Sequence, residues 1–297
     1  MLQLKNNNLT PATQQHLSKR QADINGRPAF IDKSGRAGTL WDGKTGSRAG
    51  KAAFEEIKNT LIAMCVGVEL CNYCEQSEAS DIEHILPKSL FPAHTFEWEN
   101  YLLACKKCNT THKLDAIDVF DPDGSTNAIR VANGKEPPTH DVAFVHPRRV
   151  DPMDFMDLNF DDFLFYARPP HAPNTRGFVM VEKTLDILEL NNRPTLVNFR
   201  RSAFHNYKRM LREFVETNQA ANYDELEQAV TGNPQVDRQS PFEAEKQRIL
   251  DGLRTSILTH EHPTVWREMI RQRNNLPQPI QQLFRDAPEA LTWHEIN

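Results

Sequence analysis

The chain has 297 residues, of which 39% are hydrophobic and 8% aromatic, as in an ordinary soluble globular protein. Its formal net charge of −5 excludes a protein that coats nucleic acid through its overall field, so contact with phosphate must come from local basic patches or from a partner. The longest apolar run, near residues 61–70, is shorter than the roughly 20 residues of a membrane span. The first residues lack the pattern of a secretory signal, and we expect a cytoplasmic protein.

The first 51 residues divide into a helix and an arm rich in glycine. Thr10 followed by Pro11 is typical of a helix start and predicts a helix over residues 10–24. Residues 25–51 contain six glycines among polar residues, and we expect this arm to be irregular. From residue 52 to residue 66, apolar side chains recur at helical spacing, which predicts a helix leading into the first pair of cysteines.

Four of the five cysteines form two C-x2-C pairs, Cys71 with Cys74 and Cys105 with Cys108, separated by thirty residues. This spacing predicts a tetrahedral structural zinc site, in which the chain between the pairs folds back so that they meet. Such a site contributes on the order of 10 kcal/mol to a small module. Thiolates free to bind metal suit a reducing compartment. We expect the fifth cysteine, Cys65, to be a small core residue on the apolar face of the preceding helix.

The residues between and after the cysteine pairs predict the order strand, loop, strand, helix. Residues 82–86 alternate in a way that suits a strand ending at Pro87. Residues 101–105 suit a second strand, and the residues after Cys108 suit the start of a helix. The chain is therefore expected to fold back so that the second cysteine pair lies beside the first.

An acidic stretch over residues 115–124 follows. Its end, Asp121-Pro-Asp123-Gly124, matches three positions of an EF-hand calcium loop. However, Val119 and Arg130 stand where that loop needs its first and last carboxylate ligands. A solvated turn is the better interpretation.

The remaining chain, over residues 121–297, is predicted to be mainly helical with one β-hairpin. Residues 157–167 and 177–182 are rich in aromatic and β-branched side chains and suit a pair of strands. Beyond residue 185 the pattern is helical, and capping-box signatures at Asn222 and Ser240 predict two further helix starts. An apolar stripe on the first of these helices comprises Leu196, Phe199, Ala203, Tyr207, Met210 and Phe214.

The cysteine-bounded segment resembles the HNH endonucleases. The resemblance rests on Glu83-His84, where this family more usually has Asp-His, on Asn100 at the head of the second strand, and on Asn109 directly after the fourth cysteine. It implies an α+β fold, with a small zinc-clamped ββα-metal core over residues 52–120 embedded in a mainly helical chain. Residues 1–51 would then be an added arm, and residues 121–297 would dock a partner or position a substrate.

The same resemblance implies roles for individual residues. His84 would be the general base that activates water, which its ordinary pKa near 6.5 permits at neutral pH. Glu83 and Asn109 would bind one catalytic divalent ion, Mg²⁺ or alternatively Mn²⁺. Asn100 would orient the imidazole, and His112 would be a third metal-site residue or a phosphate ligand. The implied reaction is hydrolysis of phosphodiester bonds.

Each of these residues also has a purely structural interpretation. His84 alone would suit a core histidine, Asn100 a turn, and Asn109 a helix cap. His112 is balanced between a functional and a structural role. Two departures from the usual pattern, glutamate at 83 and asparagine at 109, keep hard oxygen donors, which favours Mg²⁺ over a catalytic zinc ion.

Finer details of the motif resemble one branch of this family, the HNH subunits (PtuB) of Septu and retron-linked antiphage systems. The resemblance implies a partner ATPase similar to PtuA, and nucleic acid, DNA before RNA, as substrate. The alternatives are a catalytically idle, zinc-stabilised scaffold and a restriction-type HNH enzyme acting alone. These details are Cys71-Asn-Tyr-Cys74-Glu, Ile82-Glu-His-Ile-Leu-Pro-Lys-Ser89, Phe96-Glu-Trp98-Glu-Asn100 and Ala104-Cys-Lys-Lys-Cys-Asn-Thr-Thr-His-Lys113.

The best candidate for a local basic patch lies on the helix that starts near residue 193. Arg201, His205, Lys208 and Arg212 share a face there, opposite the apolar stripe. A solvated helix face is the favoured interpretation of this pattern.

Overall fold

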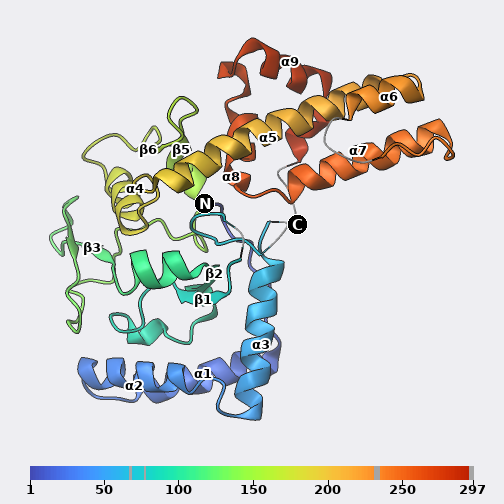
Figure 1. Ribbon diagram of the computed structural model, residues 1–297. Helices are drawn as coiled ribbons and strands as arrows, with labels where there is room; N and C mark the ends of the chain where they lie inside the picture. Colours follow the sequence, from blue (N-terminus) through green and yellow to red (C-terminus); the bar gives the residue numbers. More distant parts are fainter. Residues whose placement is uncertain (67–68, 77, 231–234, 294–297) are drawn as a thin grey trace. The chain divides into compact units, whose positions relative to one another are not determined.

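The computed structural model describes residues 1–66, 69–76, 78–230 and 235–293, which group into two compact units, Met1–Leu196 and Val197–Asn297 (Figure 1). The division of the chain into three functional parts remains a prediction. Among the described residues, the strands form three antiparallel pairs, β1 with β2, β3 with β4 and β5 with β6. No helix in these ranges combines the length and the apolar character that crossing a membrane requires.

The first unit begins with three helices, α1 (Pro11–Asn25), α2 (Phe30–Asp42) and α3 (Arg48–Ala63). The start of α1 is confirmed, since the Thr10 hydroxyl accepts a hydrogen bond from the amide of Thr13. The expectation of an irregular arm over residues 25–51 is wrong, because α2 and the first turn of α3 occupy most of it. Glycine weakens a helix by only about 1 kcal/mol per residue, so tertiary packing of α2 outweighs its propensity.

The end of α2 is held firmly by its neighbours. The Arg20 guanidinium, from α1, donates to the carbonyl of Leu40 at 2.7 Å and to those of Gly43 and Lys44 at 3.3 and 3.4 Å. At Gly50, in α3, a Cβ atom would lie 2.2 Å from the Lys44 carbonyl oxygen. Only glycine permits this approach, so Gly50 allows the turn after α2 to pack directly against α3.

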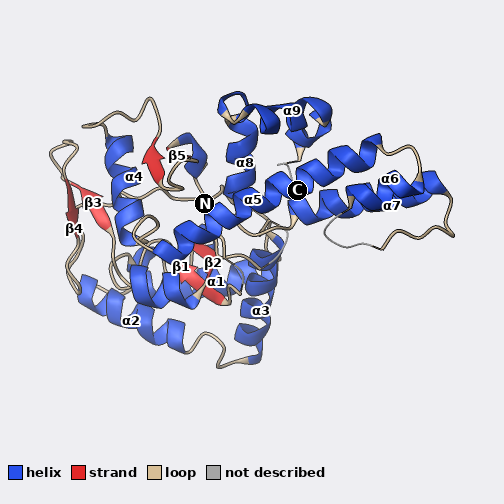
Figure 2. Ribbon diagram, turned by 45° about the horizontal axis from the view of Figure 1, so that its top comes forward, coloured by secondary structure: helices blue, strands red, loops and turns tan. Residues whose placement is uncertain are grey.

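The predicted strand, loop, strand and helix are confirmed between the cysteine pairs. Strands β1 (Asp81–His84) and β2 (Tyr101–Ala104) pair antiparallel, with Glu83 opposite Leu102 and His84 opposite Tyr101. Every residue of β2 is buried, because it packs on both faces. The helical element η3 (Lys107–Lys113) follows directly. Figure 2 shows β1 and β2 as a pair of red arrows among the helices of this unit.

The later part of the first unit departs from expectation at one element. Strands β5 (Met156–Leu158) and β6 (Phe165–Ala167) form a hairpin within the first predicted segment. The second predicted strand, residues 177–182, is instead part of α4 (Arg176–Ile187). Its N-cap Thr175 accepts from the amide of Phe178, and burial of one helix face outweighs the β-propensity of the valines. Strands β3 (Asp118–Phe120) and β4 (Ala128–Arg130) flank the acidic turn.

The second unit is helical. Tyr207 lies with its ring 5.4 Å from that of Trp266, which is 5.7 Å from Phe284, and this stack forms the core. The expectation that Ser240 caps the next helix is wrong, because that helix begins at Phe242 and Pro241 occupies the N-cap position. Phe199 leaves the predicted apolar stripe and is 43% exposed. The helices are α5 (Pro194–Gln219), which starts in the first unit, α6 (Tyr223–Ala229), α7 (Phe242–Leu258), α8 (Pro263–Arg271) and α9 (Gln278–Asp286).

Arg148 ties the N-terminal segment to the start of β2 and generates a stability prediction. Its buried guanidinium donates to the Tyr101 carbonyl at 2.6 Å and to Asn6 at 2.9 Å, and it lies over the Trp98 ring. Arg148→Ala should lower the free energy of unfolding by about 3 kcal/mol, because the carbonyl of the buried Tyr101 loses a charged donor. Chemical denaturation measures this loss. The neighbouring, exposed Arg149 is the control, and an equal loss in Arg149→Ala would contradict the assignment.

Candidate active site

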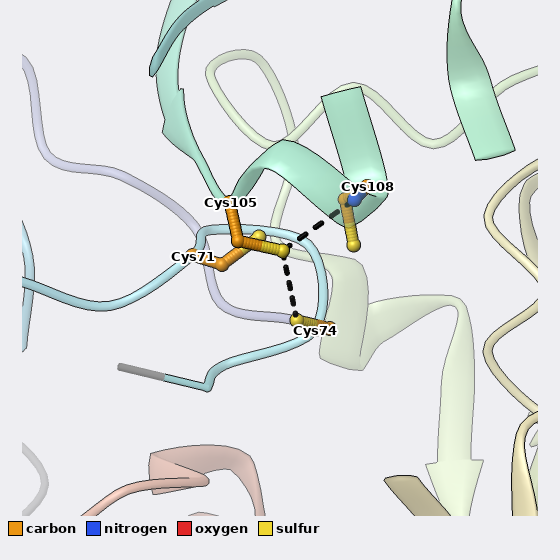
Figure 3. Close-up of side chains that lie close together, drawn as sticks. All are labelled: Cys71, Cys74, Cys105 and Cys108. Carbon is orange, nitrogen blue, oxygen red and sulfur yellow. Dashed lines mark hydrogen bonds between the residues drawn. The ribbon is translucent and has the colours of Figure 1, made fainter. Parts of the chain in front are cut away.

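The four paired cysteines form one cluster. The sulfur atoms of Cys71, Cys74, Cys105 and Cys108 all lie within 4.8 Å of one another (Figure 3). The sulfurs of Cys74 and Cys105 are 3.8 Å apart, which matches the edge of a tetrahedron with zinc–sulfur bonds of about 2.3 Å. Three of the four side chains are buried, as in a closed structural site. The donor set and its spacing therefore fit a structural zinc ion.

Backbone pairing explains how the two cysteine pairs meet. Asn72, in the first pair, exchanges two hydrogen bonds with Leu103 of β2: its amide donates to the Leu103 carbonyl, and its side-chain oxygen accepts from the Leu103 amide, both at 2.9 Å. Cys105 follows the last residue of β2, and Cys108 lies in η3. The first pair thus docks beside the end of β2, where the second pair begins.

Cys65 differs from the expectation that it belongs to the core. It lies just beyond the end of α3 and is half-buried, with its thiol near the carbonyls of Leu61 and Leu70. It does not join the cluster of four sulfurs.

A buried arginine lies against the cysteine cluster. The Arg193 guanidinium, 6% exposed, donates to the sulfur of Cys108 at 3.5 Å. Burial lowers the pKa of Arg193, but the neighbouring cysteines, Cys108 first, raise it more. Four thiolates around Zn²⁺ carry a net charge of −2, and a buried cation beside them partly neutralises it.

His84 lies at the end of β1 with its ring almost fully buried, 5% exposed. Its Nε2 is 2.9 Å from the Thr95 carbonyl oxygen, which makes Nε2 the protonated nitrogen and leaves a lone pair on Nδ1. Nδ1 has no hydrogen-bond partner among the described residues and is not one of the fully buried unpaired atoms. Burial, and next the Lys88 ammonium, lowers the pKa of His84 to about 3, so the ring is neutral at physiological pH.

Trp41, from the end of α2, covers the imidazole. Its ring centroid is 4.1 Å from that of His84 and 5.6 Å from that of Tyr101. The segment expected to be an irregular arm therefore contributes the closest aromatic neighbour of the predicted base. Only the edge of the imidazole that carries Nδ1 is left for a reactant.

Asn100 holds the loop between the two strands. Its side-chain oxygen accepts from the Leu86 amide at 2.7 Å, and its amide group donates to the carbonyls of Leu86 and His94 at 3.0 and 2.9 Å. These bonds fix the chain that follows His84 and the segment that carries Thr95. Asn100 is buried and satisfies its hydrogen bonds with backbone groups, and it makes no direct bond to the imidazole.

Two carboxylates and an amide lie on one face of the β1–η3 pair. Asp81 and Glu83 are two residues apart in β1, so their side chains point the same way. The Asn109 side chain donates to an Asp81 carboxylate oxygen at 3.0 Å. The buried Lys113 ammonium pairs with a Glu83 carboxylate oxygen at 2.7 Å and donates to the His84 carbonyl at 2.8 Å. Burial raises the pKa of Glu83, which Lys113 partly offsets.

His112 points elsewhere. Its Nδ1 is 3.2 Å from a carboxylate oxygen of Glu189, which follows α4. Asn109 and Lys113, one helical turn apart, contact β1, whereas His112 contacts the chain before Arg193. The structure thus places Asn109 beside Asp81 and Lys113 beside Glu83 through β1 and η3, whereas the ion pair of His112 is with Glu189. Strand alternation directs the His84 side chain away from the face of Asp81 and Glu83.

Several site residues escaped the sequence analysis. The two-residue spacing to Glu83 could have identified Asp81, and the four-residue spacing to Asn109 could have identified Lys113. Trp41, Thr95 and Arg193 gave no signal, because they reach the site from distant segments.

Residues 71–113 match the family model of the HNH endonucleases. This is the stretch that contains both cysteine pairs, β1, β2 and η3. We call residues 71–113 the HNH domain, after the family model that they match.

Two relatives are Septu proteins named PtuB. The protein from Bacillus thuringiensis is 29% identical over 148 residues, which cover 47% of this chain and 51% of the relative. The protein from Bacillus mycoides is 26% identical over 129 residues, or 37% of this chain and 41% of the relative. The chain thus spans about half the length of the curated relatives it matches. The likeness to these two proteins supports the resemblance to the Septu branch.

The zinc assignment predicts different effects for two cysteines. Cys108→Ser should reduce the bound zinc from about one ion per chain to near zero and lower the melting temperature sharply, because zinc binding supplies about 10 kcal/mol or more of folding free energy. Elemental analysis and thermal denaturation measure both effects. Cys65→Ser should keep its zinc, and loss of zinc in that variant would contradict the assignment of the four ligands.

Arg193 should tune the metal without binding it. Arg193→Gln should weaken zinc binding by about 10-fold, because the thiolate of Cys108 loses a charged donor. Competition with a chromogenic zinc chelator measures this change independently of any enzymatic activity. Arg193→Lys keeps the charge and should recover part of the affinity; equal affinity in all three proteins would refute the role.

Proposed function

We propose that this protein is a metal-dependent HNH endonuclease that hydrolyses phosphodiester bonds of nucleic acid, with DNA as the first candidate substrate. The observation that carries the proposal is the zinc-clamped ββα domain with a histidine and two carboxylates on its first strand. In the proposed reaction the chain supplies a general base, oxygen ligands for a divalent ion, and a loop that holds the base in position.

His84 is the proposed general base. Its Nε2 is engaged with the Thr95 carbonyl, so the neutral ring offers the Nδ1 lone pair to a water molecule. Asn100 is a proposed positioning residue, because it holds both the loop after His84 and the segment that carries Thr95. The imidazole is thereby kept in one tautomer and one orientation.

Glu83 and Asn109 are the proposed ligands of a catalytic divalent ion, and Asp81 is added as a third. Carboxylate and amide oxygens are the donors that Mg²⁺ prefers, so the residues present fit such an ion. The ion, when bound, would stabilise negative charge on the phosphate and on the leaving oxygen. Lys113 shares the Glu83 carboxylate and neutralises it when no other cation does.

The likeness to the two PtuB proteins supports a role as the nuclease of a Septu-like antiphage system. Under this proposal the chain acts in the cytoplasm beside an ATPase similar to PtuA. The net charge of −5 agrees with such a partnership, since an acidic nuclease gains from a partner that helps to hold its substrate.

A second candidate function is a zinc-stabilised scaffold without catalysis. The burial of His84 under Trp41 and the ion pair between Glu83 and Lys113 favour it, because both groups of the proposed chemistry are engaged within the protein. The nearly complete HNH residue set favours the nuclease instead.

Replacement of His84 tests the nuclease. His84→Ala should reduce Mg²⁺-dependent cleavage of DNA by about 100- to 10,000-fold, the usual effect of removing a general base. Cleavage of duplex DNA, single strands and tRNA should be measured for the chain alone and for the chain purified with a neighbouring ATPase.

Zinc content controls for folding of the cysteine cluster and should stay close to wild type, whereas the melting temperature should fall, because loss of the buried ring leaves a cavity under Trp41. Cleavage that persists in His84→Ala would refute the assigned base. A wild-type chain that cuts none of these substrates, with or without the ATPase, while still binding it, would favour the scaffold.

A further inference from the structure

The charge of the chain is distributed unevenly. Residues 1–51 contain nine lysines and arginines and three aspartates, a net charge of +6, whereas the whole chain carries −5. The remaining residues therefore carry −11. This segment, which packs over the HNH domain, is thus a basic part of an acidic protein, and it lies outside the stretch matched by the family model.

One lysine of this segment is aimed at the site. The Lys44 ammonium lies 4.6 Å from the centroid of the Trp41 ring, which in turn covers the imidazole of His84 at 4.1 Å. The backbone of Lys44 is fixed by Arg20 and by the close approach to Gly50. Its position is therefore a property of the folded segment rather than of a free surface chain.

A second lysine approaches from the HNH domain itself. Lys88 follows His84 and Pro87 in a loop that is tied to α2, since the Ser34 hydroxyl donates to the Ser89 carbonyl at 2.8 Å. Lys88 interacts electrostatically with both His84 and Lys44. Two ammonium groups from separate segments thus act on the imidazole, and the hydrogen bond between Ser34 and Ser89 ties the loop of Lys88 to the helix that carries Trp41.

Each of these two cations interacts electrostatically with a carboxylate, Lys44 with Asp42 and Lys88 with Glu83. Both are half-buried, and among the described residues neither forms an ion pair with a carboxylate. Burial lowers the pKa of Lys44, Asp42 raises it, and Lys88 lowers it further, so the pair repels. Two like charges, partly removed from water and held together, form a site that an anion stabilises.

We propose that Lys44 and Lys88 form a binding site for a backbone phosphate of the nucleic acid, and that the α1–α3 segment completes the nuclease site by supplying Lys44. Trp41 is a positioning residue, since its ring lies close to both the ammonium of Lys44 and the imidazole of His84. The proposal rests on the proposed nuclease function and adds the residues that hold its substrate.

Charge-neutral variants test this site. Lys44→Gln and Lys88→Gln should each weaken binding of a short fluorescein-labelled DNA duplex, measured by anisotropy without added divalent ions. Each should also reduce the slope of log Kd against log salt by about 0.9, between about 50 and 200 mM, because one phosphate contact is lost. Mg²⁺-dependent cleavage at low DNA concentration should fall by about 10-fold in each variant. Lys44→Arg keeps the charge and should restore binding.

The matched control is Lys51→Gln, an exposed lysine of the same basic segment, which should bind and cut as the wild type does. Unchanged binding in Lys44→Gln and Lys88→Gln would overturn the proposal, as would an equal effect of Lys51→Gln, which indicates diffuse charge. Zinc content and melting temperature verify folding. A wild-type chain that does not cut DNA would defeat the nuclease assignment alone, because the binding measurement still decides the phosphate site.

Discussion

The four-sulfur clamp is the constraint on which the first unit depends. It joins two chain segments thirty residues apart, and the paired hydrogen bonds between Asn72 and Leu103 align them. A ββα module of this size has too small a core to hold its register by hydrophobic burial alone. With the clamp closed, β1 and η3 lie side by side, and the residues of the proposed chemistry come from these two elements.

The neighbours of His84 fix the orientation of its imidazole and lower its pKa. Thr95 fixes the tautomer, Asn100 fixes the loop, and Trp41 covers the ring, so little movement is left to the imidazole. Burial also makes the ring a weak base in the absence of substrate, because its pKa is lowered to about 3. A neutral imidazole with one free nitrogen is nevertheless the form that accepts a proton, and its remaining open edge defines where a reactant can approach.

The N-terminal helices add residues to the site that the HNH domain alone does not contain. Arg20, Trp41 and Gly50 bind α2 into a fixed position against the site. This segment is basic, whereas the chain as a whole is acidic, and its Lys44 ammonium lies over the Trp41 ring that covers the proposed base. The site is therefore formed by the HNH domain together with the α1–α3 segment.

Local sequence was sufficient for much of this architecture. The cysteine spacing predicted the metal cluster, alternation and the cysteines together predicted β1, β2 and the helix after them, and Thr10 with Pro11 predicted the start of α1, because each depends on neighbours close in the chain. Tertiary packing decided the rest. Six glycines concealed α2, whose helix is sustained by contacts with α1 and the HNH domain, and the valines of α4 suggested a strand until one face was buried. The partners of the site, Trp41, Thr95 and Arg193, are distant in sequence, and only the folded chain brings them to His84 and the cysteines.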